Sequence, residues 1–393
     1  MPASSAAVRR FAVYQLACWG LLAVVAWSAH PLLALAVLVL AAWTTLPLLA
    51  FVRNGGGWRR YPTAAFRLGI VRPVLYAQLL LPVVAAVGAL GLSLGALAGD
   101  ALGWARWAVG GMLAVAAPVL VAGWIGSRRL GVREIEARVP GLPAAFDGLR
   151  IVQLSDLHVG PHTSRRFLER VTATTAALRP DLVTITGDLV DDRAEDVPAF
   201  TAVTARLRAP LGVFLIPGNH DVYAGWDAVE AALRARTDAH VLVNDVHLLR
   251  RGGAVLALLG TGDPAGMHRG PRHAAPDVAG AFARVPPGVS VVAFAHNPAL
   301  WPALAGHGAA LTLSGHTHWG QLALPRHGWS LASPFQPHAM GGYQEGDALL
   351  FVHPGTGFWG IPFRLGAYPE VTAVTLRRAE DAGLTLGARQ RAA

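Results

Sequence analysis

The sequence predicts an α/β domain preceded by an all-α region of four transmembrane helices. Of its 393 residues, 53% are hydrophobic and only 15% are charged, a balance that is unusual for a purely soluble globular protein. The hydrophobic excess is concentrated in four apolar stretches near the N-terminus. After them, short β-rich runs alternate with helical runs, which is typical of a sheet covered by helices.

The four apolar stretches carry no charged residue in their cores and lie at about 11–28, 32–52, 74–98 and 108–126. Each is close to the ~20 residues that a helix needs to cross ~30 Å of hydrocarbon. We therefore expect a transmembrane region over residues 1–127. Gly91, Gly95 and Gly99 form a small-xxx-small pattern, which we expect to pack helices within this bundle. Because no ionisable residue lies inside a span, the pattern favours an anchor over a transport path.

Arginine distribution predicts how these spans are oriented. All 33 Lys and Arg residues are Arg; residues 1–150 hold 13 Arg and four acidic residues, and residues 151–393 hold 20 of each. Ten of the early Arg flank one side of the spans, and only Arg106 lies on the other. The positive-inside rule then places the N-terminus and everything after residue 127 in the cytoplasm, at the cell membrane. Residues 151–393 have no net charge, so the sequence predicts no basic surface that would bind nucleic acid.

The main alternative for the N-terminus is a twin-arginine or lipoprotein signal with Cys18 as the lipid acceptor. Gln15 stands where a lipobox requires Leu, and Cys18 follows Arg10 too closely for a full apolar region. The sequence therefore favours a first membrane span. Since Cys18 is the only cysteine, an intramolecular disulfide is excluded.

Residues 128–378 are expected to form the α/β domain, and 379–393 a disordered tail that is rich in Arg, Ala and Gly. A first strand is expected within 132–139. The further predicted strands are 149–154, 182–186, 213–216, 241–244, 255–259, 289–295, 310–313, 348–352 and 371–376. The predicted helices are 164–178, 195–207, 225–236, 276–284 and 298–306. The alternation extends over about 260 residues from residue 130 on, which is enough for one large core.

Asp, Asn and His gather where the predicted strands end. The clusters are Asp156-Leu157-His158, Gly187-Asp188, Gly218-Asn219-His220-Asp221, His296-Asn297 and Gly315-His316-Thr317-His318. Ligands of open α/β sheets bind outside the carboxyl ends of the strands, so these five ends are expected to converge. They supply more oxygen and nitrogen donors than one ion of four to six ligands needs, which suits two ions that share a carboxylate.

In this order and spacing the clusters resemble the calcineurin-like metallophosphoesterase family, whose blocks are D-x-H, G-D, G-N-H-D, a lone His and G-H-T-H. The resemblance runs from about residue 147 to 376. Gly320-Gln321, Arg364 and Pro369-Glu370 are similar to a subgroup of membrane-associated bacterial phosphoesterases. The family resemblance implies that the α/β domain is a sandwich of two β-sheets flanked by helices.

The resemblance also implies roles for individual residues. It assigns one metal ion to Asp156, His158, Asp188 and His318. It assigns a second to Asp188, Asn219, His296 and His316, with Asp188 bridging. His220 matches the family's catalytic histidine that binds no metal, with Asp221 behind it to orient the ring. Because the donors are oxygen and imidazole without sulfur, Mn²⁺, Fe²⁺ and Zn²⁺ are favoured over Ca²⁺.

Two further positions are weaker candidates for substrate contact. Trp319 stands where the subgroup has glycine, and its indole would either narrow the cleft and stack on substrate or pack against a neighbouring loop. Arg364 would either bind an anionic head group or form an ion pair with Glu370.

The expected function is a membrane-anchored phosphoesterase with a binuclear metal centre that cleaves a phosphomonoester, phosphodiester or pyrophosphate bond. A lipid head group is the favoured substrate because the active site is tethered to a membrane. The alternative is a membrane sensor or transport-associated protein whose metal domain binds a phosphorylated ligand without turnover. The His220-Asp221 pair argues against that alternative, since pure binding does not need it.

Overall fold

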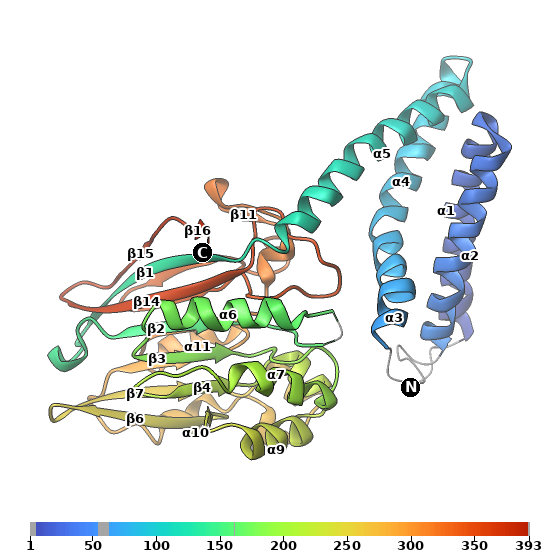
Figure 1. Ribbon diagram of the computed structural model, residues 1–393. Helices are drawn as coiled ribbons and strands as arrows, with labels where there is room; N and C mark the ends of the chain where they lie inside the picture. Colours follow the sequence, from blue (N-terminus) through green and yellow to red (C-terminus); the bar gives the residue numbers. More distant parts are fainter. Residues whose placement is uncertain (1–4, 54–62, 161, 392–393) are drawn as a thin grey trace. The chain divides into compact units, whose positions relative to one another are not determined.

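The chain divides into two compact units, Met1–Ala122 and Gly123–Ala393. A computed structural model describes residues 5–53, 63–160 and 162–391 (Figure 1). Arg59 and Arg60, two of the ten Arg on the side of the spans that is predicted to face the cytoplasm, lie outside the described residues, as do the last two residues of the predicted tail.

The regular structure described in the first unit is helical. Its four long helices are α1 (Ser5–Ala29), α2 (Pro31–Arg53), α4 (Arg72–Leu97) and α5 (Ala101–Gly126). A short helix α3 (Ala64–Phe66) and a π-helical segment (Arg67–Val71) precede α4. The four helices are long and apolar enough to cross a membrane. This part of the predicted fold class is confirmed.

Buried amide groups join three of these helices. Gln15 of α1 is 1% exposed, and its side-chain amide oxygen accepts hydrogen bonds from Trp19 at 3.1 Å and from Thr45 of α2 at 3.1 Å. Its amide nitrogen donates to Gln78 of α4 at 2.7 Å. Polar groups in an apolar bundle need such internal partners because lipid offers none.

The expected close packing of the glycine pattern occurs between α4 and α5. A Cβ atom at Gly91 would lie 2.8 Å from the Cα atom of Ala105, and one at Gly95 would lie 2.7 Å from the Cβ atom of Trp104. Such distances leave no room for a side chain. Gly91 and Gly95 therefore pack helices inside the bundle, as expected. Gly99 does not, because it follows the end of α4 and no atom lies within 4 Å of its Cβ position.

The second unit contains two large β-sheets. The first has the order β15-β1-β14-β2-β3-β4-β5, with β16 also paired to β1, and the second has the order β12-β13-β9-β8-β7-β6. The strands of the first sheet are β1 (Gly131–Pro140), β2 (Arg150–Leu154), β3 (Leu182–Thr186), β4 (Val213–Ile216), β5 (His240–Val241), β14 (Glu370–Ala379), β15 (Gly383–Leu386) and β16 (Gln390–Arg391). Those of the second are β6 (Asp245–Arg251), β7 (Ala254–Gly260), β8 (Val291–Phe294), β9 (Ala309–Ser314), β12 (Gly341–Glu345) and β13 (Ala348–Val352). A small separate ribbon pairs β10 (Ala323–Leu324) with β11 (Trp329–Ser330).

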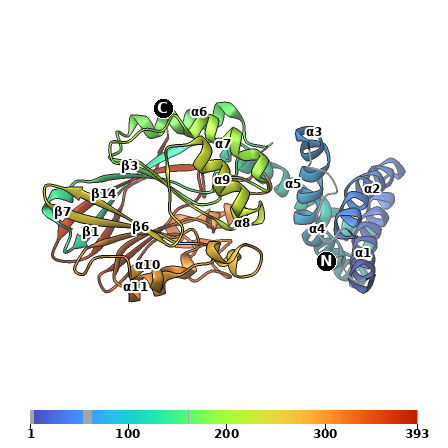
Figure 2. The same ribbon diagram turned by 90° about the horizontal axis from the view of Figure 1, so that it is seen from below.

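Helices cover the outer face of each sheet, so the unit has four layers (Figure 2). The helices on the first sheet are α6 (Arg165–Ala177), α7 (Val197–Thr204) and α9 (Trp226–Arg236). Those on the second are α10 (Val278–Phe282) and α11 (Trp301–Gly306). Three apolar cores fill the spaces between the layers, and the central one lies between the two sheets. The predicted sandwich of two sheets flanked by helices is confirmed.

Parallel pairing sets the position of the site. Strands β2, β3, β4 and β5 run parallel to one another, as do β7, β8, β9 and β13. The carboxyl ends of each set therefore lie on one edge of its sheet, where loops with polar side chains can meet.

Two segments differ from the prediction. The tail from residue 379 was expected to be disordered, but β15 and β16 pair with β1 because its exposed edge offers unpaired hydrogen-bonding groups. The predicted strand at 241–244 is shorter, and β6 follows it as one arm of a hairpin with β7. Gly252 and Gly253, both with positive φ, form that turn.

The last turn of α5 belongs to the second unit and contacts a loop after β13. The carbonyl of Gly123 accepts a hydrogen bond of 2.9 Å from the backbone N–H of Arg364. A Cβ atom at Gly126 would overlap the carbonyl oxygen of Arg364, and one at Gly123 would overlap the ring of Phe363. Glycine at both positions therefore lets the helix backbone approach this loop closely.

We expect Gly126→Ala to destabilise the second unit by about 1–3 kcal/mol, because the added methyl group has no space against Arg364. Thermal unfolding of the purified protein in detergent measures this loss. Gly111→Ala in the same helix is the matched control, since nothing lies within 4 Å of its Cβ position. Equal melting temperatures for the two variants would contradict the close packing at Gly126.

Candidate metal centre

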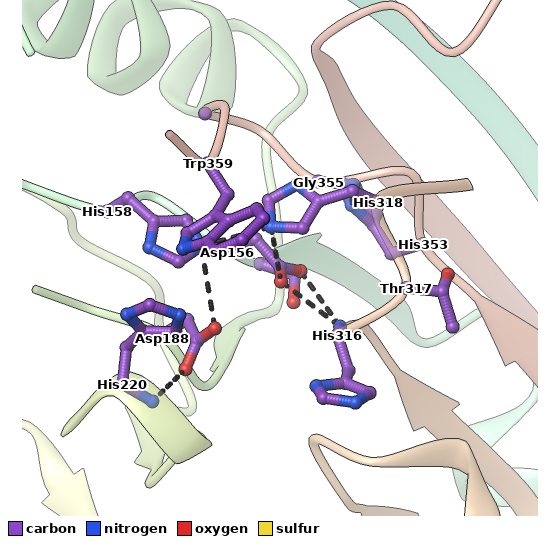
Figure 3. Close-up of polar contacts among 12 residues, drawn as sticks. Asp156, His158, Asp188, His220, His316, Thr317, His318, His353, Gly355 and Trp359 are labelled. Atoms are coloured by element: carbon purple, nitrogen blue, oxygen red, sulfur yellow. Dashed lines mark hydrogen bonds and ion pairs between the residues drawn. The ribbon is translucent and has the colours of Figure 1, made fainter. Parts of the chain in front are cut away.

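The residues predicted to bind metal follow five different strands of the two sheets. They lie directly after β2 (Asp156, His158), β3 (Asp188), β4 (Asn219), β8 (His296) and β9 (His316, His318). Figure 3 shows several of these side chains converging. The expectation that these strand ends converge is therefore confirmed.

Strained backbone is concentrated at this site. Five of the seven predicted ligands have positive φ, namely Asp156, His158, Asp188, His316 and His318. Residues with a Cβ atom adopt this conformation at a cost, and they persist in it where the surrounding structure enforces it. All five residues lie in the segments that follow the strands, where their side chains share one space.

The motif glycines make room for the carboxylates. A Cβ atom at Gly218 would overlap the carboxylate of Asp188, and one at Gly315 would overlap that of Asp156. The backbone N–H of His220 donates to Asp188 at 2.8 Å, and that of His316 donates to Asp156 at 3.1 Å. The neighbouring loops thereby fix both carboxylates.

One cluster consists of the four side chains assigned to the first ion. One ligand atom from each of Asp156, His158, Asp188 and His318 lies within 4.8 Å of all the others. The Nε2 atoms of His158 and His318 are 3.0 Å apart, and Nε2 of His318 is 3.3 Å from the Asp156 carboxylate. All four side chains are buried.

The side chains assigned to the second ion adjoin this cluster. Nε2 of His296 lies 3.3 Å from Asp188 and 3.2 Å from the Oδ1 atom of Asn219. Nδ1 of His316 lies 2.8 Å from the same Asn219 oxygen. Asp188 contacts both groups, because its Oδ2 atom is also 3.4 Å from Nε2 of His158.

Electrostatics at the site favour a positive charge. Burial would raise the pKa of Asp188, but His296 and the other histidines hold it well below its usual value. Burial would lower the pKa of His296, but the charge of Asp188 raises it well above its usual value. The carboxylates therefore retain a proton on His296 that a cation at this position would replace.

Of the other three histidines, His316 and His318 are neutral at pH 7. Burial would lower the pKa of the third, His158, but its hydrogen bond to Asp191 and the charge of Asp188 raise it. Burial and the charge of His296 lower the pKa of His316 to about 4, and burial together with Arg364 holds the pKa of His318 well below its usual value. Neutral imidazole is the form that binds metal. The donor set, its burial and its charge therefore fit divalent cations with oxygen and nitrogen ligands.

His220 and Asp221 differ from the prediction in how they are connected. Nδ1 of His220 donates to the carbonyl of Asp191 at 2.6 Å. The buried carboxylate of Asp221 instead accepts hydrogen bonds from the backbone N–H groups of Leu189, Val190 and Gly218, at 3.0, 3.1 and 2.8 Å. The prediction that Asp221 orients the His220 ring is therefore wrong. Asp221 holds the loops after β3 and β4 together, since the N–H groups of both loops point at it.

Both weaker substrate candidates are also buried. Trp319 is 3% exposed, and its indole N–H donates to the carbonyl of Val352 at 2.9 Å. It packs against a neighbouring loop, and the stacking interpretation is wrong. Arg364 is fully buried and donates to Nδ1 of His318 at 2.7 Å and to its carbonyl at 3.0 Å.

Neither interpretation of Arg364 is therefore correct, because Glu370 pairs with Arg133 instead, at 3.0 Å. The guanidinium of Arg364 also donates to the carbonyls of Pro354, Ala367 and Gly357. It thus anchors His318 and a nearby loop rather than substrate.

The sequence analysis missed Asp263, which follows β7. Its side chain is buried, and burial, partly offset by the charge of His296, raises its pKa to about 6. The pattern of polar residues after strands that identified the other residues also applies to Asp263, since only Thr261 separates Gly262-Asp263 from the apolar run that forms β7.

We expect Asp221→Asn to lower the stability of the second unit by about 1–3 kcal/mol, because an amide offers one acceptor atom where two now serve three N–H groups. Thermal unfolding of the metal-free protein measures this loss, with the exposed Asp238→Asn as the control. An unchanged melting temperature of Asp221→Asn would contradict the role of Asp221 in holding the two loops together.

Comparisons with known proteins agree with this geometry. Residues 149–320 match the family described as calcineurin-like phosphoesterase. A zebrafish "transmembrane protein with metallophosphoesterase domain" is 33% identical over 63% of this chain, which spans 57% of that relative's length. An "uncharacterized metallophosphoesterase YkuE" of Bacillus subtilis is 30% identical over 60% of this chain and 82% of its own length.

A Chlamydia muridarum relative named "UDP-2,3-diacylglucosamine pyrophosphatase LpxG" is 26% identical over 62% of this chain and 90% of its own. Among solved structures, the NAD nucleotidase of Haemophilus influenzae aligns with a TM-score of 0.42 at 13% identity, over 62% of this chain and 50% of that one. The matched family, the Bacillus relative and the arrangement of Asp, Asn and His lead to one assignment. This chain belongs to the calcineurin-like metallophosphoesterase family.

Proposed function

We propose that the protein is a metal-dependent phosphoester hydrolase with two divalent ions in its active site. The observation that carries this proposal is the position of Asp188, whose Oδ2 atom lies 3.4 Å from His158 and 3.3 Å from His296. One carboxylate oxygen between two sets of donors is the arrangement expected of a bridging ligand.

The two ligand sets follow from these contacts. Asp156, His158, Asp188 and His318 would hold one ion, a set whose ligand atoms lie within 4.8 Å of one another. The second would be held by Asp188, Asn219, His296 and His316. Ions such as Mn²⁺, Fe²⁺ or Zn²⁺ would lower the pKa of a nearby water and neutralise phosphoryl oxygens.

His220 is proposed to act directly on the substrate. Its ring is only partly buried, and the Asp191 carbonyl accepts the Nδ1 proton at 2.6 Å. That hydrogen bond fixes the tautomer and leaves Nε2 to face the substrate, where the protonated ring can donate to the leaving oxygen. The partner of the catalytic histidine is therefore a backbone carbonyl.

A lipid phosphoester or pyrophosphate is the proposed substrate. Four helices of the chain are apolar enough to cross a membrane, and a relative is named as a pyrophosphatase of a diacylated sugar nucleotide. A hydrolase that is tied to a bilayer encounters lipid head groups at high local concentration. We further propose that the second unit faces the cytoplasm, as the positive-inside rule predicts.

We expect the metal-depleted protein to regain hydrolysis of bis(p-nitrophenyl) phosphate or p-nitrophenyl phosphate when Mn²⁺ is added. Asp188→Asn should lose at least about a hundredfold in kcat/KM and bind less metal, because a neutral amide cannot offset the charge of two ions. Released p-nitrophenol and metal content by atomic emission are the measurements. Near-normal turnover in Asp188→Asn would contradict the proposal, and Asp238→Asn controls for loss of a surface charge.

We expect His220→Asn to keep its metal and lose about 10²–10⁴-fold in rate, the usual contribution of a general acid or base. The same aryl phosphate assay and metal analysis apply, with the exposed His307→Asn as the control. If His220→Asn loses metal in proportion to its activity, His220 is a ligand and the assigned role is wrong.

A further inference from the structure

An exposed tryptophan lies beside the proposed catalytic histidine. The side chain of Trp359 is 52% exposed, although it is large and apolar. Its ring centroid is 6.0 Å from that of His220, at an interplanar angle of 65° (Figure 3). A large exposed aromatic side chain next to an active site commonly marks a place where a ligand binds.

The backbone of Trp359 is held rigidly. The side-chain amide of Gln321 donates to the carbonyl of Trp359 and accepts from its N–H, both at 3.1 Å. Gln321 itself has a φ of 60°, so this position is strained. The Gly320-Gln321 motif, to which the ligand assignment gives no role, thus fixes the loop that carries this indole.

The same loop is also tied down on either side of Trp359. The guanidinium of Arg364 donates to the carbonyl of Gly357, and the backbone N–H of Leu365 donates to the carbonyl of Gln321 at 2.9 Å. A loop backbone that is held in this way loses little conformational freedom when a ligand binds.

A second exposed aromatic ring contacts His220. Tyr223 of α8 (Asn219–Tyr223) is 48% exposed, and its ring centroid is 5.7 Å from that of His220. The guanidinium of Arg269 lies 5.4 Å from the centre of the Tyr223 ring. His220, which we propose donates to the leaving oxygen, is therefore accompanied by two aromatic surfaces that face solvent.

We infer that Trp359 is a specificity-determining residue whose indole binds the apolar group that a substrate carries next to its phosphate. The inference rests on the proposed function, because it takes His220 to mark the position of the phosphate. An indole face accepts either a planar ring or an alkyl chain through dispersion and burial. The chemical class is thus a phosphoester whose organic group is apolar close to the phosphorus.

The test measures binding of phosphonates, which carry the anion but are not hydrolysed. Methyl-, butyl- and phenylphosphonate are titrated calorimetrically into the full-length, Mn²⁺-loaded protein in detergent. We expect wild type to bind the phenyl or butyl compound about tenfold more tightly than the methyl compound, and Trp359→Ala to reduce this ratio to near one. Trp359→Phe should retain most of the preference, and Gln321→Ala should lose part of it.

Trp329→Ala, which removes another exposed indole on β11, is the matched control and should keep the wild-type ratio. Preference for phenylphosphonate alone supports the inference with a planar substrate group, and preference for both compounds supports it with an alkyl chain. Equal ratios in wild type and Trp359→Ala, or an equal loss in Trp329→Ala, would overturn it. Metal content and melting temperature confirm that Trp359→Ala is folded and loaded.

This design separates the two proposals. If the protein discriminates among phosphonates through Trp359 but hydrolyses no aryl phosphate, the hydrolase proposal fails and the binding surface stands. If it hydrolyses aryl phosphates but binds the three phosphonates equally well, the inference about Trp359 fails and the hydrolase proposal stands.

Discussion

The burial of several carboxylates in one small region is the physical constraint on which this structure depends. Asp156, Asp188, Asp221 and Asp263 are all at most 2% exposed, and three of them have a raised pKa. Without compensation, such like charges repel one another and lose their hydration. Backbone N–H groups, histidines and the bound cations that we propose provide the compensation. The strained loops, the motif glycines and the buried Arg364 keep these groups in position around the carboxylates.

The sequence was sufficient to predict the architecture and the residues that converge. Apolar runs of strand length were easy to recognise because parallel strands are buried on both faces. Five of them were followed by clusters of Asp, Asn and His, so the topology of parallel sheets implied a shared edge. The order of the motifs then indicated the family, and the family resemblance predicted that the strands form two sheets.

The connections within the site could not be predicted from sequence. The partner of His220 is the backbone carbonyl of Asp191. Every residue has such a carbonyl, so residue types do not reveal which one accepts the hydrogen bond. Asp221 is next to His220 in sequence, but in the helix α8 successive side chains point in different directions, so adjacency was misleading. Burial of Trp319 and Arg364 depends on how the loops fold over one another, which local patterns do not reveal.

The hydrogen bond between Gly123 and Arg364 has a practical consequence for dissecting this protein. The apolar stretch reaches Gly126, so a soluble fragment designed from hydropathy would begin after it and would lack the carbonyl that accepts from Arg364. Arg364 in turn supports His318, which means that such a truncation removes a support of a proposed metal ligand while leaving every ligand in place. A fragment that starts within the final turn of α5 keeps that support, so the boundary of the metal-binding unit lies inside the last apolar helix.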